Sequence, residues 1–254
     1  MPFGRDNGVL RRKGKERFWN TQENERFFLN NRQEMDFKTS QKLYSAARMG
    51  KYSRACSGDK SKTMQLYRYN LRLCQRFYGA LHLFEVMLRN AINEHYASYF
   101  SDNDWIVNQT DSGKLLSYNR DEIRQTEVGY RKRGIYNNDK MVASLTMGFW
   151  TKLFSKKRYK RGGKTLLQIF PNKAKGKNQS DIYKDLTHIR EFRNRIAHHE
   201  PVCFDGSGNI STAFARRHYQ LIRDYIVYFG QQPDNVLSWA EKPDEILDKI
   251  DKIR

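Results

Sequence analysis

Residues 190–201 read Arg-Glu-Phe-Arg-Asn-Arg-Ile-Ala-His-His-Glu-Pro and gather side chains able to act on a phosphodiester. Cleavage of RNA without a metal ion needs a base for the 2′-hydroxyl proton, an acid for the 5′-oxygen, and a cation for the charge that develops on phosphorus. Arg193 and His198 supply much of this chemistry, and Asn194 lies beside the arginine. The run is therefore a candidate site for metal-free RNA cleavage.

One straight helix through this run would not aim Arg193 and His198 at the same phosphate. Residues five apart differ by about 140° around the helix axis, whereas Asn194 and His198, four apart, share a face. Arg193 also falls about 20° from the middle of a predicted apolar stripe. That stripe consists of Ile182, Leu186, Ile189 and Ile196. A guanidinium there requires a carboxylate, a partner chain or an anion.

Two arrangements would bring the groups together. The helix could unwind before Pro201 and turn His198 back, or a second copy of the helix could supply the missing groups across a two-fold axis. The adjacent His199 could substitute for His198 or orient it. A purely structural interpretation stays open as well, in which a carboxylate such as Glu85 or Glu191 pairs with Arg193 and the histidines cap the helix.

The charge of the chain points to a polyanionic partner. The formal net charge is +19 over 254 residues, and no Asp or Glu occurs from Lys140 to Ser180. Such a segment is expected to contact phosphates, and interleaved Tyr159 and Phe170 would suit stacking on unpaired bases. The alternative is a solvated basic loop. The predicted RNA-binding residues are Lys152, Lys156, Lys157, Arg158, Lys160, Arg161, Lys164, Lys173, Lys175 and Lys177.

Composition and periodicity predict an all-α fold. Helix-forming residues dominate, with only five prolines. A long core helix is expected from Asp59 or Ser61 to about Phe100, with Asn70 and His95 as hydrogen-bonded polar residues on its apolar face. That face consists of Leu66, Leu73, Phe77, Leu81, Phe84, Leu88 and Ala91.

The other elements are shorter. A basic arm is predicted at residues 1–20, short helices after a cap at Thr39 or Ser40, and a polar loop over 101–113 that contains Trp105. Further helices are expected over 115–133, from a cap at Asp139 to Phe154, from a cap at Ser180 through the motif, and from Thr212 to Gly230. The division predicted is an arm with short helices at 1–58 and a helical domain at 59–254.

Several classes of protein are not favoured. No apolar run is long enough to span a membrane, and the N-terminus lacks the apolar core of a signal peptide, so a cytoplasmic protein is expected. Cys56, Cys74 and Cys203 show no metal-ligand spacing and are predicted to be reduced structural thiols. No metal or cofactor is expected, and the missing Gly-rich phosphate loop argues against nucleotidyl transfer.

Three segments resemble one family. Arg193-Asn194-Arg195-Ile196-Ala197-His198 matches the Arg-Asn-x-x-x-His motif of the HEPN superfamily, and residues 189–202 resemble its bacterial abortive-infection (Abi-like) branch. Residues 83–92, Leu-Phe-Glu-Val-Met-Leu-Arg-Asn-Ala-Ile, and residues 145–154, Leu-Thr-Met-Gly-Phe-Trp-Thr-Lys-Leu-Phe, resemble the same branch. The resemblance covers roughly residues 40–240.

The resemblance implies a HEPN-type helical bundle and a homodimer whose composite cleft cuts RNA without metal, in phage defence or as a toxin that halts host growth. Arg193 and His198 take the catalytic positions and Asn194 the polar position beside the arginine. Glu85 and Arg89, four apart in the earlier segment, would brace Arg193 or pair with each other. The competing function is a non-catalytic RNA-binding module that positions a structured RNA partner.

Overall fold

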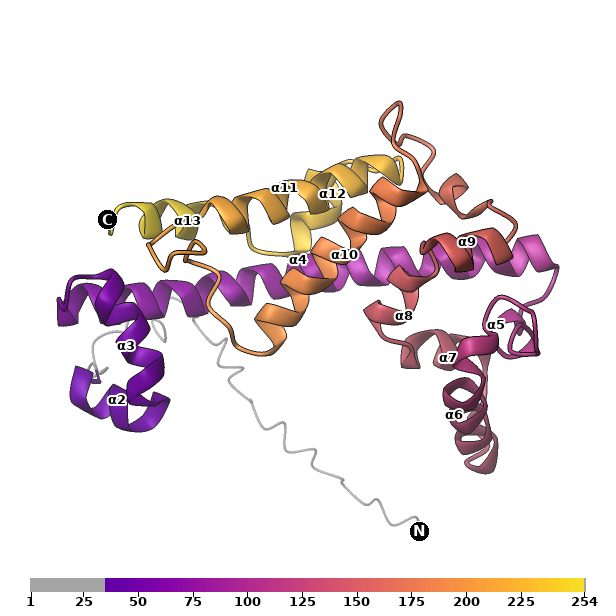
Figure 1. Ribbon diagram of the computed structural model, residues 1–254, viewed down its shortest axis with the longest axis horizontal. Helices are drawn as coiled ribbons and strands as arrows, with labels where there is room; N and C mark the ends of the chain where they lie inside the picture. The colour runs from indigo at the N-terminus through magenta and orange to yellow at the C-terminus, as the bar shows by residue number, and fades with distance from the viewer. Residues whose placement is uncertain (1–34, 254) are drawn as a thin grey trace, which may run out of the picture.

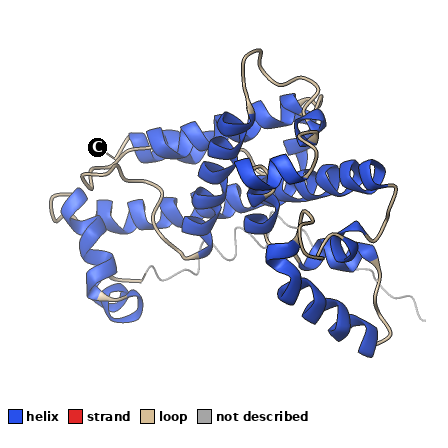
Figure 2. Cartoon of the chain, turned by 45° about the vertical axis from the view of Figure 1, so that its right-hand side comes forward, coloured by secondary structure: helices blue, strands red, loops and turns tan. Residues whose placement is uncertain are grey.

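Helices make up almost all regular structure in the computed structural model, which describes residues 35–253. Twelve α-helices and three short 3-10 helices occur in that part of the chain, with no β-strand and one isolated bridge between Phe204 and Ile210 (Figure 2). The predicted all-α class is confirmed for these residues. The basic arm predicted at residues 1–20 lies outside them.

Most of the helices follow one another with short connections, and the longest connection, over 198–212, follows the motif helix. The first half of the described chain comprises α2 (Phe37–Tyr44), α3 (Ala46–Ala55), α4 (Lys60–Phe100), α5 (Trp105–Asn108), η1 (Ser117–Asn119), α6 (Arg120–Lys132) and α7 (Asn138–Ser144). The second half comprises α8 (Met147–Lys152), α9 (Lys156–Arg161), η2 (Leu166–Ile169), α10 (Gln179–Ala197), α11 (Ala213–Tyr228), α12 (Pro233–Val236), η3 (Leu237–Trp239) and α13 (Asp244–Asp251).

The long helix α4 is the axis of the molecule (Figure 1). Asp59 caps its start by accepting a hydrogen bond from the Lys62 amide, and the helix then runs for 41 residues. Helices α3, α8, α10, α11 and α13 all contact it. The predicted apolar stripe is confirmed, since all of its members except the half-buried Ala91 are buried.

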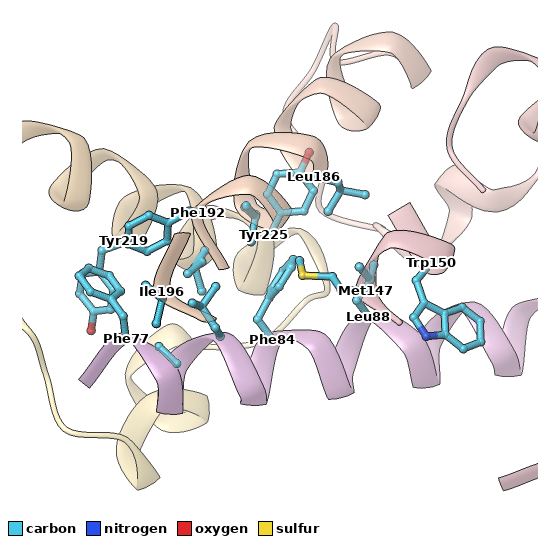
Figure 3. Packing of buried hydrophobic residues seen from close by; sticks show 14 of the residues in the cluster. Phe77, Phe84, Leu88, Met147, Trp150, Leu186, Phe192, Ile196, Tyr219 and Tyr225 are labelled. Atoms are coloured by element: carbon cyan, nitrogen blue, oxygen red, sulfur yellow. The ribbon is translucent and has the colours of Figure 1, made fainter. Parts of the chain in front are cut away.

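Aromatic rings fill the space between α4 and the helices that cover it (Figure 3). The Phe77 ring meets Phe192 of α10 edge-on at 4.8 Å between centroids, and Phe84 meets Tyr225 of α11 at 6.2 Å. Trp150 of α8 is fully buried farther along. Such contacts add roughly 0.5–1.5 kcal/mol per pair beyond the burial of area, so they fix how α10 lies on α4.

The polar residues predicted on the stripe have the hydrogen bonds expected of them. Asn70 is buried, and its Oδ1 accepts from the Val202 amide at 2.9 Å. His95 is half-buried, with Nε2 2.9 Å from the Thr165 hydroxyl. Asn70 thus connects α4 to the segment directly after the motif.

Three predicted helix caps are wrong, because the capping oxygen lies upstream of the predicted residue in each case. Asp36, not Thr39 or Ser40, caps α2 by accepting a hydrogen bond from the Thr39 amide. Asn137, not Asp139, caps α7. Asn178, not Ser180, caps α10 and forms a capping box with Asp181. In each case the extended residue before the first helical turn places its side chain on the free amides.

The helix predicted from Asp139 to Phe154 is two helices. Leu145 is extended, with φ −86° and ψ 138°, and Thr146 caps α8 directly after it. The Leu145 carbonyl then accepts from the Trp150 indole at 3.3 Å. The break allows α7 and α8 each to bury an apolar face in a different direction.

Two other boundaries also differ from the prediction. Trp105, expected in a loop, begins α5 and is buried, with its indole donating to Asn93 Oδ1 at 2.9 Å. The charged helix expected from Leu115 begins at Arg120, because Leu115 and Leu116 are drawn into the core. None of the described helices combines the length and apolarity that crossing a bilayer requires.

Gly162 is predicted to be required for packing. A Cβ added there would lie 2.2 Å from the hydroxyl oxygen of the buried Tyr96. Gly162→Ala should lower the free energy of unfolding by about 1–3 kcal/mol, as overpacking does. Urea denaturation measures this, and Gly162→Ala combined with Tyr96→Phe should recover part of the loss.

Gly129→Ala is the matched control, because nothing lies within 4 Å of a Cβ added at this position of α6. It should raise stability by up to about 1 kcal/mol, as alanine does in a helix interior. Equal effects of the two substitutions would contradict the packing role of Gly162.

Candidate functional site

The helix that carries the motif does not unwind before His198. Helix α10 continues to Ala197, and the His198 amide still donates to the Asn194 carbonyl at 2.8 Å. His198 itself has φ −88° and ψ 11°. The first of the two arrangements, in which the chain turns His198 back toward Arg193, is therefore not observed.

The turn comes one residue later, at His199. His199 has φ 58°, in the left-handed region. Its amide donates to Ile196 O at 3.0 Å and the Glu200 amide donates to Arg195 O at 2.8 Å. These two bonds form a Schellman motif, which most proteins close with glycine at the position of His199. The histidines do end the helix, through their backbones.

Side chains from two distant helices hold this turn. Arg48 of α3 donates through Nη2 to the His199 carbonyl. Asn70 of α4 accepts from the Val202 amide at 2.9 Å, and Arg195 donates to the Pro201 carbonyl at 3.0 Å. The sequence does not predict the role of Arg48, because it lies 151 positions from its partner and has no local signal.

Arg193 points toward α4. Its Nε lies 3.7 Å from Glu85 Oε2, an ion pair longer than a hydrogen bond. The Arg193 side chain remains 42% exposed, so the prediction of a charge within a buried stripe is wrong: the residue lies at the stripe's margin. Glu191 contacts Arg190 at 3.9 Å instead. Of the two carboxylates considered for Arg193, Glu85 is the partner.

No side-chain hydrogen bond or ion pair joins the other candidate residues to Arg193 or Glu85 in the described part of the chain. Asn194 is half-buried, and His198 and His199 are exposed. Arg89 is half-buried, with its Nε enclosed and without a hydrogen-bond partner, and no ion pair joins it to Glu85. No hydrogen bond links the side chains of Arg193 and His198. A single chain therefore assembles Arg193 with Glu85 and leaves His198 separate.

The three segments that carry the family resemblance meet in space. Residues 83–92 lie on α4, 145–154 cover α8, and 189–202 end α10; each of these helices contacts the other two (Figure 1). Leu88, Trp150 and Leu186 line the shared core (Figure 3). At the surface, a Cβ added to Gly148 would lie 3.8 Å from Arg190 Cδ. The motif therefore sits on a rigid three-helix support.

Two cavities in the described part of the chain do not include the motif. One, of about 570 Å³, lies between α10 and α11 and is lined by residues that include Lys184, His188 and Arg217. The other, of about 580 Å³, lies between α4 and the segment from Phe229 to Trp239. Arg193 and His198 line neither, so they face open surface.

The predicted RNA-binding bases are mostly free of counterions. Of the ten, only Lys177 forms an ion pair in the described part of the chain, with Asp185. The other nine have no carboxylate within ion-pair distance there; they are Lys152, Lys156, Lys157, Arg158, Lys160, Arg161, Lys164, Lys173 and Lys175. The short helix α9 concentrates this charge, since five of the nine lie within it.

The two aromatic residues of this segment that were predicted to stack on RNA bases, Tyr159 and Phe170, are not available for stacking. Phe170 is buried and packs against Phe154 and Phe229. Tyr159 is half-buried, and its hydroxyl donates to the Lys164 carbonyl at 2.6 Å. The apolar core holds both rings, which the charge pattern of the segment does not reveal.

Neither the cysteines nor a metal-binding cluster provides a second reactive site in the described part of the chain. Cys56, Cys74 and Cys203 are free, and burial raises the pKa of all three thiols, that of Cys74 to about 11. They are therefore protonated at neutral pH and poorly nucleophilic. The described residues contain no group of three or more His, Cys, Asp or Glu side chains placed to hold a metal ion.

No protein-family model matches this sequence, and neither a curated protein nor a solved structure matches the chain.

The left-handed turn predicts opposite effects of glycine at two adjacent histidines. His199→Gly should raise the free energy of unfolding by about 1 kcal/mol, because glycine adopts positive φ without the Cβ penalty. His198→Gly should instead lower it by about 0.5–1 kcal/mol, since His198 keeps a near-helical backbone. Urea denaturation of both variants measures the difference, and a loss of stability in His199→Gly would contradict the assignment.

Asn70 is predicted to be the main anchor of the segment after the motif. Asn70→Ala leaves the buried Val202 amide without an acceptor and should cost about 1–3 kcal/mol of stability. Asn90→Ala, at an exposed site on the same helix, is the control and should change stability by less than about 0.5 kcal/mol. Equal effects in urea denaturation would show that the hydrogen bond is not needed.

Proposed function

We propose that the chain is a metal-independent endoribonuclease of the HEPN type, with a composite active site at a homodimer interface. One observation carries this proposal. Arg193 and His198 both reach solvent from one continuous helix, yet no hydrogen bond joins their side chains within a chain. Because α10 does not unwind before His198, a second copy of the helix is the arrangement left to complete the site.

Each group then has a role in the reaction. In a symmetric cleft that holds two Arg193–His198 sets, one His198 takes the proton of the 2′-hydroxyl and the 2′-oxygen attacks phosphorus. The Arg193 guanidinium offsets the negative charge that develops there. The second His198 donates a proton to the departing 5′-oxygen. The products are a 2′,3′-cyclic phosphate and a 5′-hydroxyl.

The surroundings support a polyanionic substrate. Nine of the ten predicted bases lack a carboxylate partner in the described residues, so their charge is free to neutralise phosphates. Glu85 holds Arg193 at 3.7 Å without enclosing it, which leaves the guanidinium free to exchange its carboxylate for a phosphate. A role in phage defence or as a toxin that halts growth follows from the resemblance to the abortive-infection branch.

The proposal predicts cleavage of single-stranded RNA in the presence of EDTA. His198→Ala should slow cleavage by about 10²–10⁴-fold, and Arg193→Ala by about 10²–10³-fold. Gel analysis of a labelled oligoribonucleotide measures both rates. His82→Ala and Arg72→Ala, exposed residues on α4, are the matched controls and should cleave as the wild type does.

A mixed dimer tests the composite cleft. A dimer of one wild-type chain and one His198→Ala chain, isolated with two different tags, should be at least about tenfold slower than the wild type, because both imidazoles act on one phosphate. Half of the wild-type rate would contradict a shared cleft. If RNA binds tightly but is never cut, and both alanine variants bind it equally, the chain is instead a non-catalytic RNA-binding module.

A further inference from the structure

An exposed tyrosine lies directly against the basic helix α9. Tyr118 belongs to η1, and 55% of the residue is exposed. The Lys157 ammonium lies 4.6 Å from the centre of its ring and the Arg161 guanidinium carbon 4.8 Å from it. Arg161 also donates to the Ser117 hydroxyl at 2.9 Å. The ring is therefore held by cations and a neighbouring hydrogen bond while much of it stays accessible.

The two cations approach the ring from the same element. Lys157 and Arg161 are four residues apart, so they project from one face of α9. Cation–π attraction holds the ring on that face. Because the cations come from one helix and more than half of the residue is exposed, the ring retains a surface open to solvent.

The cations around this ring have no carboxylate at ion-pair distance in the described residues, and Glu122 acts on Arg158 only at longer range. Lys156, Lys157, Arg158, Lys160 and Arg161 form no ion pair within residues 35–253. Burial lowers the pKa of Arg158, and one of its terminal nitrogens is enclosed without a hydrogen-bond partner. A hydrogen bond from Lys157 and the charge of Arg161 lower the pKa of the Tyr118 hydroxyl. The site therefore presents a π-surface in a positive field.

Other exposed aromatic residues lack this combination. Tyr78 on α4 is 67% exposed, and Trp239 of η3 is 89% exposed. No cation lies over either ring in the described residues. Aromatic rings beside uncompensated cations are the pattern of single-strand binding surfaces, on which bases stack and the cations bind phosphates.

We propose that Tyr118, Lys157 and Arg161 form a binding site for single-stranded RNA, in which one unpaired base stacks on the open surface of the Tyr118 ring. The adjacent phosphates contact Lys157 and Arg161. This site takes over the stacking role that the sequence suggested for Tyr159 and Phe170. It rests on the proposed function in taking RNA as the ligand, but it does not depend on cleavage.

The experiment measures the affinity of a fluorescein-labelled twelve-nucleotide oligouridylate by anisotropy at one fixed salt concentration. The full-length His198→Ala chain is used, so that cleavage does not remove the probe. Tyr118→Ala should weaken binding by about five- to a hundredfold, the range of one base–aromatic stack. Tyr118→Phe and Tyr118→Trp keep a ring and should bind within about threefold of the parent. Tyr78→Ala is the matched control and should bind as the parent does.

Two further measurements identify what Tyr118 contacts. An abasic oligomer with the same phosphates should bind Tyr118→Ala and the parent equally. Lys157→Gln and Arg161→Gln should each reduce the slope of log affinity against log salt by about 1. A Tyr118→Ala variant that is folded by circular dichroism and binds oligouridylate as tightly as the parent would overturn the site. So would an equal loss on the abasic probe.

The outcome is separable from that of the proposed function. If the wild-type chain cuts no RNA but Tyr118→Ala loses oligouridylate binding, the nuclease proposal fails and this site stands. If the wild-type chain cuts RNA but every Tyr118 variant made in the His198→Ala chain binds oligouridylate as that chain does, the nuclease stands and this site fails.

Discussion

Burial of one face of α4 holds the fold together. At 1.5 Å per residue this helix is about 60 Å long, far longer than any other described helix. Such a helix is not stable in water through propensity alone; it needs a continuous apolar cover. The covering helices come from both sides of it in the sequence. Because they all dock on one straight rod, the positions of α8, α10 and α11 are fixed relative to one another.

That rod also carries the polar residues that define the candidate site. Asn70 holds the Val202 amide, and Glu85 holds Arg193. Both side chains leave α4 near its apolar stripe, where a backbone amide or a guanidinium from the α10 region needs a partner. The candidate site therefore lies at the margin of the core, where its side chains are supported by packed helices and remain open to solvent.

Continuity of α10 imposes a second constraint. A helix that stays regular through Ala197 keeps residues 193 and 198 about 140° apart, and the Schellman turn begins only after His198. No rotation of side chains on one helix removes this separation. The same regularity that buries Ile189 and Ile196 thus keeps Arg193 and His198 on different faces of the helix, which is why the proposed cleft takes these groups from two chains.

Local patterns predicted α4, α10 and α11, because the 3.6-residue spacing of apolar residues on a helix can be recognised from the order of residues alone. The motif and the acid-free basic segment were equally visible, as was the use of Asn70 and His95 as hydrogen-bonded polar residues. Caps were misplaced by two to four residues, because which oxygen reaches the free amides depends on the backbone angles before the helix. Contacts between helices then selected the side chains that meet. Glu85 rather than Glu191 pairs with Arg193, Arg48 supports the His199 turn, and Phe170 enters the core while Tyr118 reaches the surface. The sequence thus specified the helices and the chemical groups they carry, and packing on α4 set the directions in which those groups point, because direction follows from contacts between helices and not from the order of residues within one.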